Sequence, residues 1–253
     1  MTQPELYGWF HILCLVLTVV LIVALLMLKT NEKNVRWILG ITSLIVILLE
    51  VYKQLYFCID IGQSITFSYR WNIFPWQFCS TPMYIGLLAA LVKNKKMHYR
   101  LCCYLCTYAI MAGICVMLYP SSVFTENILI NIQTMINHGT MVSLGVYLLL
   151  CDYVKCEKRT LIEAFKVFAV CILIAITLNE IAYYGGIVAE HPFNMFYISR
   201  HVKGNLPVFG AIQEVVSYPM SLVIYITGFT LGSGIILWII KRKEDVYEYF
   251  SSR

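Results

Sequence analysis

The sequence predicts an all-α membrane protein that crosses the bilayer several times. Of its 253 residues, 60% are hydrophobic and 13% are charged, whereas soluble domains average about 45–50% apolar and about 25% charged residues. Apolar runs recur that reach the roughly 20 residues needed to cross a hydrocarbon layer. Basic residues gather between alternate runs. We therefore expect residues 1–253 to form a single polytopic domain of seven transmembrane helices.

The seven expected spans follow one another without a linker, a low-complexity segment or an internal repeat. The first apolar run lies behind a start that carries Glu5, no basic residue and no small-residue cleavage site, so we expect a retained helix and not a signal peptide. The connections 58–75 and 185–216 are rich in aromatic residues and glycines and are expected to fold over one mouth of the bundle. The spans are residues 8–28, 36–57, 76–92, 100–119, 127–151, 161–184 and 217–240.

The basic residues predict how the chain is oriented. Because lysines and arginines are retained on the cytoplasmic side, the N-terminus is expected outside and the C-terminus in the cytoplasm, in a multi-pass protein of the plasma membrane. This placement accounts for the net charge of +5 without a nucleic-acid partner. Most of the 19 lysines and arginines lie in the connections assigned to the inner face: Lys29, Lys33, Arg36, Lys93, Lys95, Lys96, Arg100, Lys155, Lys158, Arg159, Lys241, Arg242, Lys243 and Arg253.

Polar residues recur on one face of several expected spans, where a lipid environment makes each of them costly. At about 1.5 Å per residue from the basic anchors, Glu50, Cys79 and His138 fall within about one helical turn of a common level in the outer half of the bilayer. We expect a polar pocket there that opens outward, with Gly139 and Gly145 allowing a neighbouring helix to come close. Its predicted lining comprises Glu50, Lys53, Gln77, Asn131, Thr134, Asn179, Glu180, Asn194 and Tyr218.

Simpler roles fit the same residues. Glu50 and Lys53 suit a structural ion pair, and the polar residues of the fifth span suit hydrogen bonds to neighbouring helices. A lone thiol such as Cys79 most often only packs. Cys103 and Cys106 have CxxC spacing, but no second pair accompanies them, so we expect no metal site and no cofactor.

The stretch RWNIFPWQFCSTPMY places an amide, a thiol and two hydroxyls where the third span is expected to begin. Pro75 suits the first turn of a helix, and Pro82 is expected to bend the helix by removing one of its hydrogen bonds. His138 is the best proton acceptor in the expected pocket because an unperturbed imidazole titrates near about 6.5. Whether Cys79 is a free thiol or is joined to Cys58 stays open.

Four motifs resemble those of the YwaF-like integral membrane proteins of bacteria, over about residues 35–240. FPWQFCSTPMYIGLLAAL is similar to the family's Leu-Pro-x-His/Gln-Leu/Phe-Cys signature, and INHGTMVSLGVYLLL to its histidine-bearing span. LNEIAYYGG with FNMFYIS, and then VSYPMSLVIY, resemble two later elements. The animal branch of that family includes an acyltransferase that remodels ether phospholipids, with a conserved cysteine. The resemblance implies that role for Cys79, although Gln77 stands where many relatives have histidine.

Two functions compete on these observations, and a packing-only scaffold is a third possibility. In the first, Cys79 attacks an acyl ester of a membrane phospholipid and His138 takes the thiol proton. Gln77 then donates a hydrogen bond to the oxyanion, and Glu50, Glu180 and Tyr218 orient His138 or hold a headgroup amine. In the second, the pocket binds or transports a small polar solute.

Overall fold

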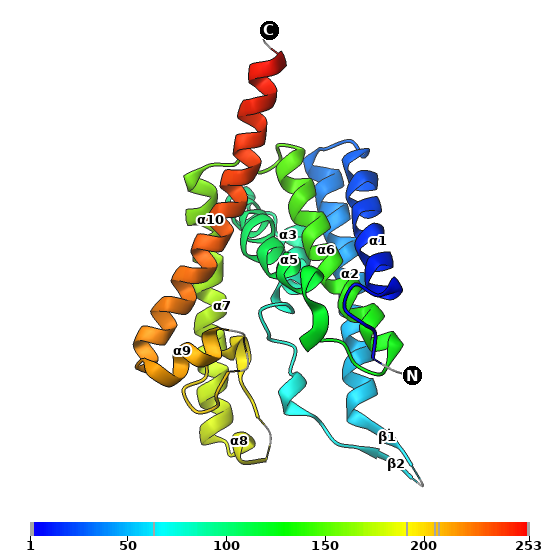
Figure 1. The fold of residues 1–253 in the computed structure, drawn as a ribbon, viewed down its shortest axis with the longest axis vertical. Coiled ribbons are helices and arrows are strands. Elements are labelled where there is room, and N and C mark those ends of the chain that lie inside the picture. Colours follow the sequence, from blue (N-terminus) through cyan, green and yellow to red (C-terminus); the bar gives the residue numbers. More distant parts are fainter. Residues whose placement is uncertain (1–2, 63, 191, 205, 207, 252–253) are drawn as a thin grey trace.

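The computed structural model describes residues 3–62, 64–190, 192–204, 206 and 208–251, which form a bundle of helices (Figure 1). In Figure 1, α7 and α10 lie on one side, α1, α2 and α6 lie on the other, and α3 and α5 lie between them. The main helices are α1 (Trp9–Leu26), α2 (Glu32–Cys58), α3 (Thr81–Leu91), α4 (Lys95–Tyr104), α5 (Ile110–Leu118), α6 (Ile128–Leu150), α7 (Lys158–Tyr184), α8 (Ile187–Glu190), α9 (Phe209–Val215) and α10 (Tyr218–Ser251).

Each expected span coincides with a helix, although the ends differ. α4 and α5 continue into one another through a π-helical turn, Leu105–Ala109, and this composite helix is far more buried than α1 or α10. Among the described residues, five helical segments are long and apolar enough to cross a membrane: Trp9–Leu26, Glu32–Cys58, Lys95–Leu118, Lys158–Tyr184 and Tyr218–Arg242. The protein is therefore an all-α polytopic membrane protein.

Two other helices that coincide with expected spans, α3 and α6, do not reach the length or hydropathy needed to cross a membrane, for different reasons. α3 has 11 residues, which at about 1.5 Å per residue is too short to cross alone. α6 has 23 residues, but five buried polar residues lower its hydropathy: Asn131, Gln133, Asn137, His138 and Ser143. Both helices lie inside the bundle, where α6 packs against α1, α2 and α5, and α3 packs against α2 and α4.

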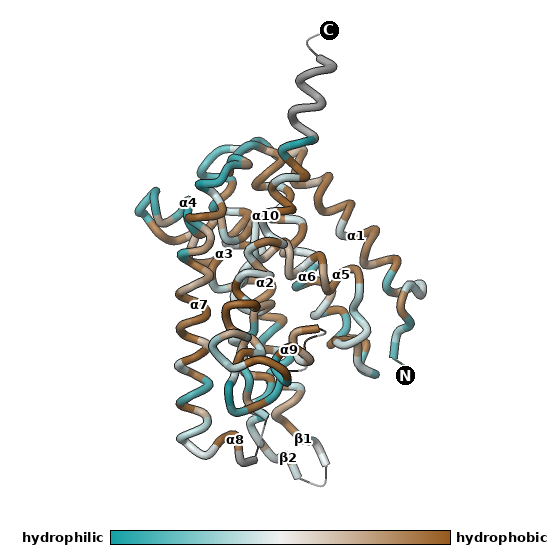
Figure 2. Tube along the Cα trace, turned by 60° about the vertical axis from the view of Figure 1, so that its left-hand side comes forward, coloured by the Kyte–Doolittle hydropathy of each residue, from teal (hydrophilic) through white to brown (hydrophobic). Residues whose placement is uncertain are grey.

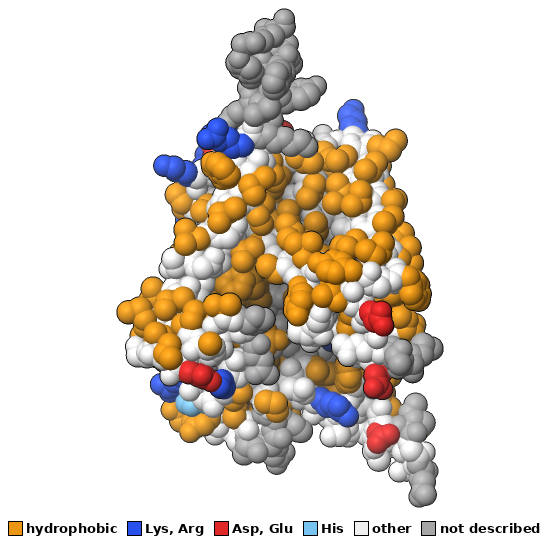
Figure 3. Space-filling model, in the orientation of Figure 1, with side chains coloured by type: hydrophobic (Ala, Val, Ile, Leu, Met, Phe, Trp, Pro, Cys, Tyr) orange, Lys and Arg blue, Asp and Glu red, His pale blue; other side chains and the backbone are white. Residues whose placement is uncertain are grey.

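Polar and apolar residues are sorted along the bundle. Figure 2 shows hydrophobic residues along α1 and α7 and hydrophilic residues at the end nearest the C-terminus. In the space-filling view, hydrophobic side chains cover the middle, lysines and arginines lie at that same end, and acidic and basic side chains mix at the other (Figure 3).

Two glycines on α6 allow the close helix packing that their positions predicted. A Cβ atom on Gly139 would lie 2.7 Å from the Thr18 hydroxyl of α1, and one on Gly145 would lie 2.7 Å from Cβ of Ile110 on α5. Any side chain at either glycine would therefore push a neighbouring helix away from α6.

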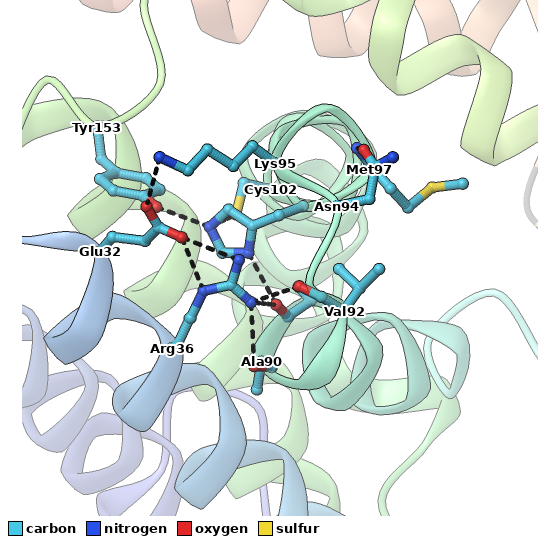
Figure 4. A network of polar contacts seen from close by, with 11 residues as sticks. Glu32, Arg36, Ala90, Val92, Asn94, Lys95, Met97, Cys102 and Tyr153 are labelled. Atoms are coloured by element: carbon cyan, nitrogen blue, oxygen red, sulfur yellow. Dashed lines mark hydrogen bonds and ion pairs between the residues drawn. The ribbon is translucent and has the colours of Figure 1, made fainter.

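A half-buried arginine contacts the end of α3. The Arg36 guanidinium donates hydrogen bonds to the carbonyl oxygens of Ala89 (3.2 Å), Ala90 (3.2 Å) and Val92 (2.6 Å), and it pairs with Glu32 at 3.0 Å (Figure 4). The last carbonyls of a helix lack partners within the helix and favour a cation. Arg36 therefore joins α2 to the C-terminus of α3 and sets where α3 stops.

The two long connections, 58–75 and 185–216, have different structures. Residues 58–75 were expected to cover the mouth, but their first part forms the antiparallel hairpin β1 (Ile59–Ile61) and β2 (Ile65–Phe67), which projects from the end of α2 (Figure 1). The chain returns to the bundle through the 3₁₀ turn Trp71–Ile73. Residues 192–199, with the 3₁₀ turn Met195–Tyr197, bond directly to the segment that precedes α3.

Candidate functional site

Cys79 lies in a turn immediately before α3. The amide N–H groups of Ser80 and Thr81 donate to the Gln77 carbonyl oxygen at 2.9 and 3.1 Å, so the chain turns sharply at the thiol. Pro75 lies before this turn and outside the helix, whereas Pro82 occupies the first turn of α3. The expected bend at Pro82 is therefore absent, because a proline in a first turn removes no helical hydrogen bond. Cys79 and Cys58 are both free thiols.

A side chain from α6 holds the backbone of Cys79. Asn137 Nδ2 donates to the Cys79 carbonyl oxygen at 3.1 Å. One turn earlier on the same face, Gln133 Nε2 donates to Glu50 Oε2 at 3.1 Å. Neither amide was among the predicted site residues, although their i, i+4 spacing is the signal of a shared helical face.

His138 follows Asn137 and is 3% exposed. Its Nδ1 lies 2.7 Å from the Thr134 carbonyl oxygen. A carbonyl can only accept, so we assign the proton to Nδ1 and the lone pair to Nε2. Nε2 is buried and has no hydrogen-bond partner among the described residues. The imidazole therefore carries an unused acceptor inside the bundle.

Cys79 and His138 are not in direct hydrogen-bond contact. Within the described part of the chain, no hydrogen bond joins Cys79 Sγ to the imidazole. What links the two residues in the structure is Asn137, which bonds the Cys79 carbonyl oxygen and directly precedes His138 on α6.

Glu50 forms a buried network between α2 and α6. Its carboxylate accepts from Lys53 Nζ at 2.6 Å, Gln54 Nε2 at 2.8 Å and Gln133 Nε2 at 3.1 Å. Glu50 is 4% exposed, and Gln54 also donates to the Ile73 carbonyl oxygen at 2.7 Å. The ion pair suggested by the sequence is present. The hydrogen bonds of this network join α2 to α6 and to the segment before α3.

The predicted oxyanion donor, Gln77, is bound elsewhere. Its Nε2 donates to the Asn194 carbonyl oxygen at 3.0 Å, and its Oε1 accepts from the Phe196 amide at 3.0 Å. Asn179 of α7 holds the same loop, with its Oδ1 accepting from the Met195 amide at 2.7 Å. Gln77 and Asn179 therefore position a loop beside Cys79.

That loop has a strained backbone. Phe196 and Tyr197 both have a φ of +58°, a left-handed conformation that is unusual for residues other than glycine. The Phe196 ring stacks on Phe78 with centroids 5.4 Å apart. Burial, and to a smaller extent the Cys79 thiol, raises the pKa of Tyr197. Backbone strain persists where surrounding contacts impose it, and such positions cluster at functional sites.

Three residues that were predicted to line the pocket make their contacts outside the Cys79–His138 region. Glu180 pairs with Arg200 at 2.8 Å and with His201 at 3.2 Å, so it does not orient His138. Tyr218 faces the Glu180–Arg200 pair. Asn131 binds the backbone of Thr125 through both its amide oxygen and its amide nitrogen, which secures the start of α6.

The fold and the site together define a polytopic helical membrane protein with a polar interior site built around a turn at the start of a short helix. A model of the TMEM164 family matches residues 6–241. The chain therefore belongs to the TMEM164 family. No curated protein and no solved structure matches it.

Proposed function

We propose that this TMEM164-family protein is a membrane-embedded acyl-transfer enzyme that acts on phospholipids, with Cys79 as the nucleophile and His138 as the proton acceptor. The observation that carries the proposal is the unpartnered, buried Nε2 of His138, one residue from the amide that holds the Cys79 backbone. A buried acceptor left without a partner is costly in free energy, and proton transfer gives it a use. The resemblance of four motifs to the YwaF-like proteins, whose animal branch includes an acyltransferase, supports the same activity.

The reaction divides into two acyl transfers. His138 Nε2 takes the proton of the thiol, and the thiolate attacks the carbonyl carbon of an acyl ester. A sulfur–carbon bond forms, the carbonyl electron pair moves to oxygen, and collapse breaks the ester carbon–oxygen bond. The lysophospholipid alkoxide leaves with the proton from the imidazolium. The hydroxyl of an acceptor lysophospholipid, or water, then attacks the thioester with His138 again as base, and the thiolate is released.

The proposal requires a small rearrangement before chemistry. Because no hydrogen bond joins the thiol to the imidazole in this structure, the ring must turn or a water must bridge them. Catalytic hydrogen bonds commonly tighten only when substrate binds.

The thioester intermediate provides the test. Purified protein in nanodiscs that contain a phospholipid with an alkyne-tagged acyl chain is expected to carry hydroxylamine-sensitive label on the Cys79 peptide. The Cys58 peptide, which holds another free thiol, serves as the internal control and is expected to stay unlabelled. Label distributed equally over both, or its absence from Cys79, would refute covalent catalysis. Turnover of a polar solute with an inert Cys79 would favour transport.

We infer further that the protein makes seven passes in the plasma membrane, with its N-terminus outside. One feature supports the count: α6 packs against α1, α2 and the composite helix that contains α5, all of which are long and apolar. We expect a glycosylation acceptor inserted in the β1–β2 hairpin to be modified in microsomes, and one inserted in residues 151–157 to stay unmodified. Modification of the second acceptor would reverse the orientation.

A further inference from the structure

A second buried polar side-chain atom of the bundle, besides His138 Nε2, has no partner among the described residues. Three such side-chain atoms occur in the described part of the chain: His138 Nε2 and the hydroxyl groups of Tyr147 and Tyr225. Tyr225 lies on α10 and is 3% exposed. Leaving a hydroxyl buried without a hydrogen bond destabilises the folded protein. Phenylalanine would fill the same space without that cost, so the structure gives no packing reason for this hydroxyl.

The position of Tyr225 follows from a series of ring contacts. Its ring lies 4.5 Å from that of Phe229, one turn further along α10. Phe229 meets Phe78 edge-on at 4.8 Å, and Phe78 directly precedes Cys79. The Tyr225 hydroxyl interacts electrostatically with the Cys79 thiol and with Tyr197 of the strained loop. α10 therefore brings a phenol to the neighbourhood of the thiol.

Several other polar groups in this neighbourhood are already engaged. Gln77 binds the loop through its amide nitrogen and oxygen, and Asn137 donates to the Cys79 carbonyl oxygen. Tyr104, the other buried tyrosine that interacts electrostatically with the thiol, shares a 2.8 Å hydrogen bond with Thr81. Of these two tyrosines, Tyr225 alone retains an uncommitted hydroxyl.

We infer that the Tyr225 hydroxyl is a catalytic residue: it donates the hydrogen bond that stabilises the oxyanion formed when Cys79 attacks the acyl carbonyl. The inference rests on the proposed acyl transfer. As the sulfur–carbon bond forms, the carbonyl electron pair moves to oxygen and meets the phenolic O–H, which keeps its proton. When the carbonyl re-forms, the ester carbon–oxygen bond breaks and the alkoxide takes its proton from the His138 imidazolium. A donor fixed in a site without water is worth more than the same donor in solution.

Tyr225→Phe separates this role from a structural one. In nanodiscs with the alkyne-tagged phospholipid, we expect the rate of acyl-thioester formation on Cys79 to fall about 10²-fold, as it does when one oxyanion donor is removed. The melting temperature should stay equal or rise, because the variant loses a buried hydroxyl that has no partner. Alkylation of Cys79 by iodoacetamide forms no oxyanion, so its rate should not change.

Tyr147→Phe is the matched control. It deletes another buried tyrosine hydroxyl, beside Thr30 and Cys151 at the far end of α6, and should leave acylation unchanged. A Tyr225→Phe variant that acylates Cys79 at the full rate would overturn the inference and leave the proposed function intact. Equal losses of acylation and alkylation would also overturn it, because they indicate a displaced thiol. Absence of the thioester in the unaltered protein would instead refute the proposed function.

Discussion

Replacing His138 by glutamine is expected to lower the rate of acyl transfer about 10²–10⁴-fold, the usual contribution of a positioned general base. Glutamine is close to histidine in length and can still donate to the Thr134 carbonyl oxygen, but it accepts no proton at neutral pH. The variant should therefore fold normally and lose only its acyl-transfer activity. Its residual rate should rise with pH more steeply than that of the unaltered protein, because hydroxide replaces the missing base.

His98→Gln is the matched control for this experiment. His98 is also buried, but both of its ring nitrogens are engaged, Nδ1 with the Ala89 carbonyl oxygen and Nε2 with the Tyr153 hydroxyl, each at 2.7 Å. Its replacement should lower the melting temperature and leave the rate per folded molecule unchanged. If His138→Gln behaved in the same way, with lost stability and full activity, His138 would be a helix tie and not a base.

The helices were predictable because a membrane imposes one strong rule, a run of about 20 apolar residues for each crossing. That rule locates α1, α2 and α7 within a few residues and the start of α10 within one residue, although α10 continues to Ser251, beyond the expected end at residue 240. It fails at the start of the expected span 76–92, where residues 76–80 turn before α3 begins, since Gln77 bonds to a loop more than a hundred residues away. Such pairings leave no periodic trace in the sequence.

The site was predictable only where it depends on helical spacing. The common level expected for Cys79 and His138 was derived from the rise per residue, and in the structure Asn137 of α6 contacts the Cys79 turn. Glu180 was misplaced because its partners, Arg200 and His201, lie in a long connection whose path no pattern specifies. The uncommitted hydroxyl of Tyr225 is a property of the packed structure, so sequence offers no sign of it.

Neutralising Lys53 alone is expected to destabilise the protein strongly. Lys53→Met would leave the Glu50 carboxylate, which is 4% exposed, with only the amides of Gln54 and Gln133. Breaking a buried ion pair on one side costs about 3–5 kcal/mol, because the remaining charge is buried and uncompensated. The loss would be measured as the free energy of unfolding in nanodiscs.

Lys166→Met is the control. The Glu163–Lys166 pair has the same i, i+3 spacing and the same 2.6 Å separation, but its lysine side chain is 47% exposed, and Glu163 keeps a second cationic partner, Arg100. An exposed pair contributes about 0–1 kcal/mol. The double variant Glu50→Gln with Lys53→Met should recover most of the lost stability, since paired removal of both charges is often neutral. A double variant as unstable as Lys53→Met would contradict this account. If it is stable but fails to acylate Cys79, the two charges act in the chemistry as well as in the fold, because Lys53 acts on both the thiol and the imidazole.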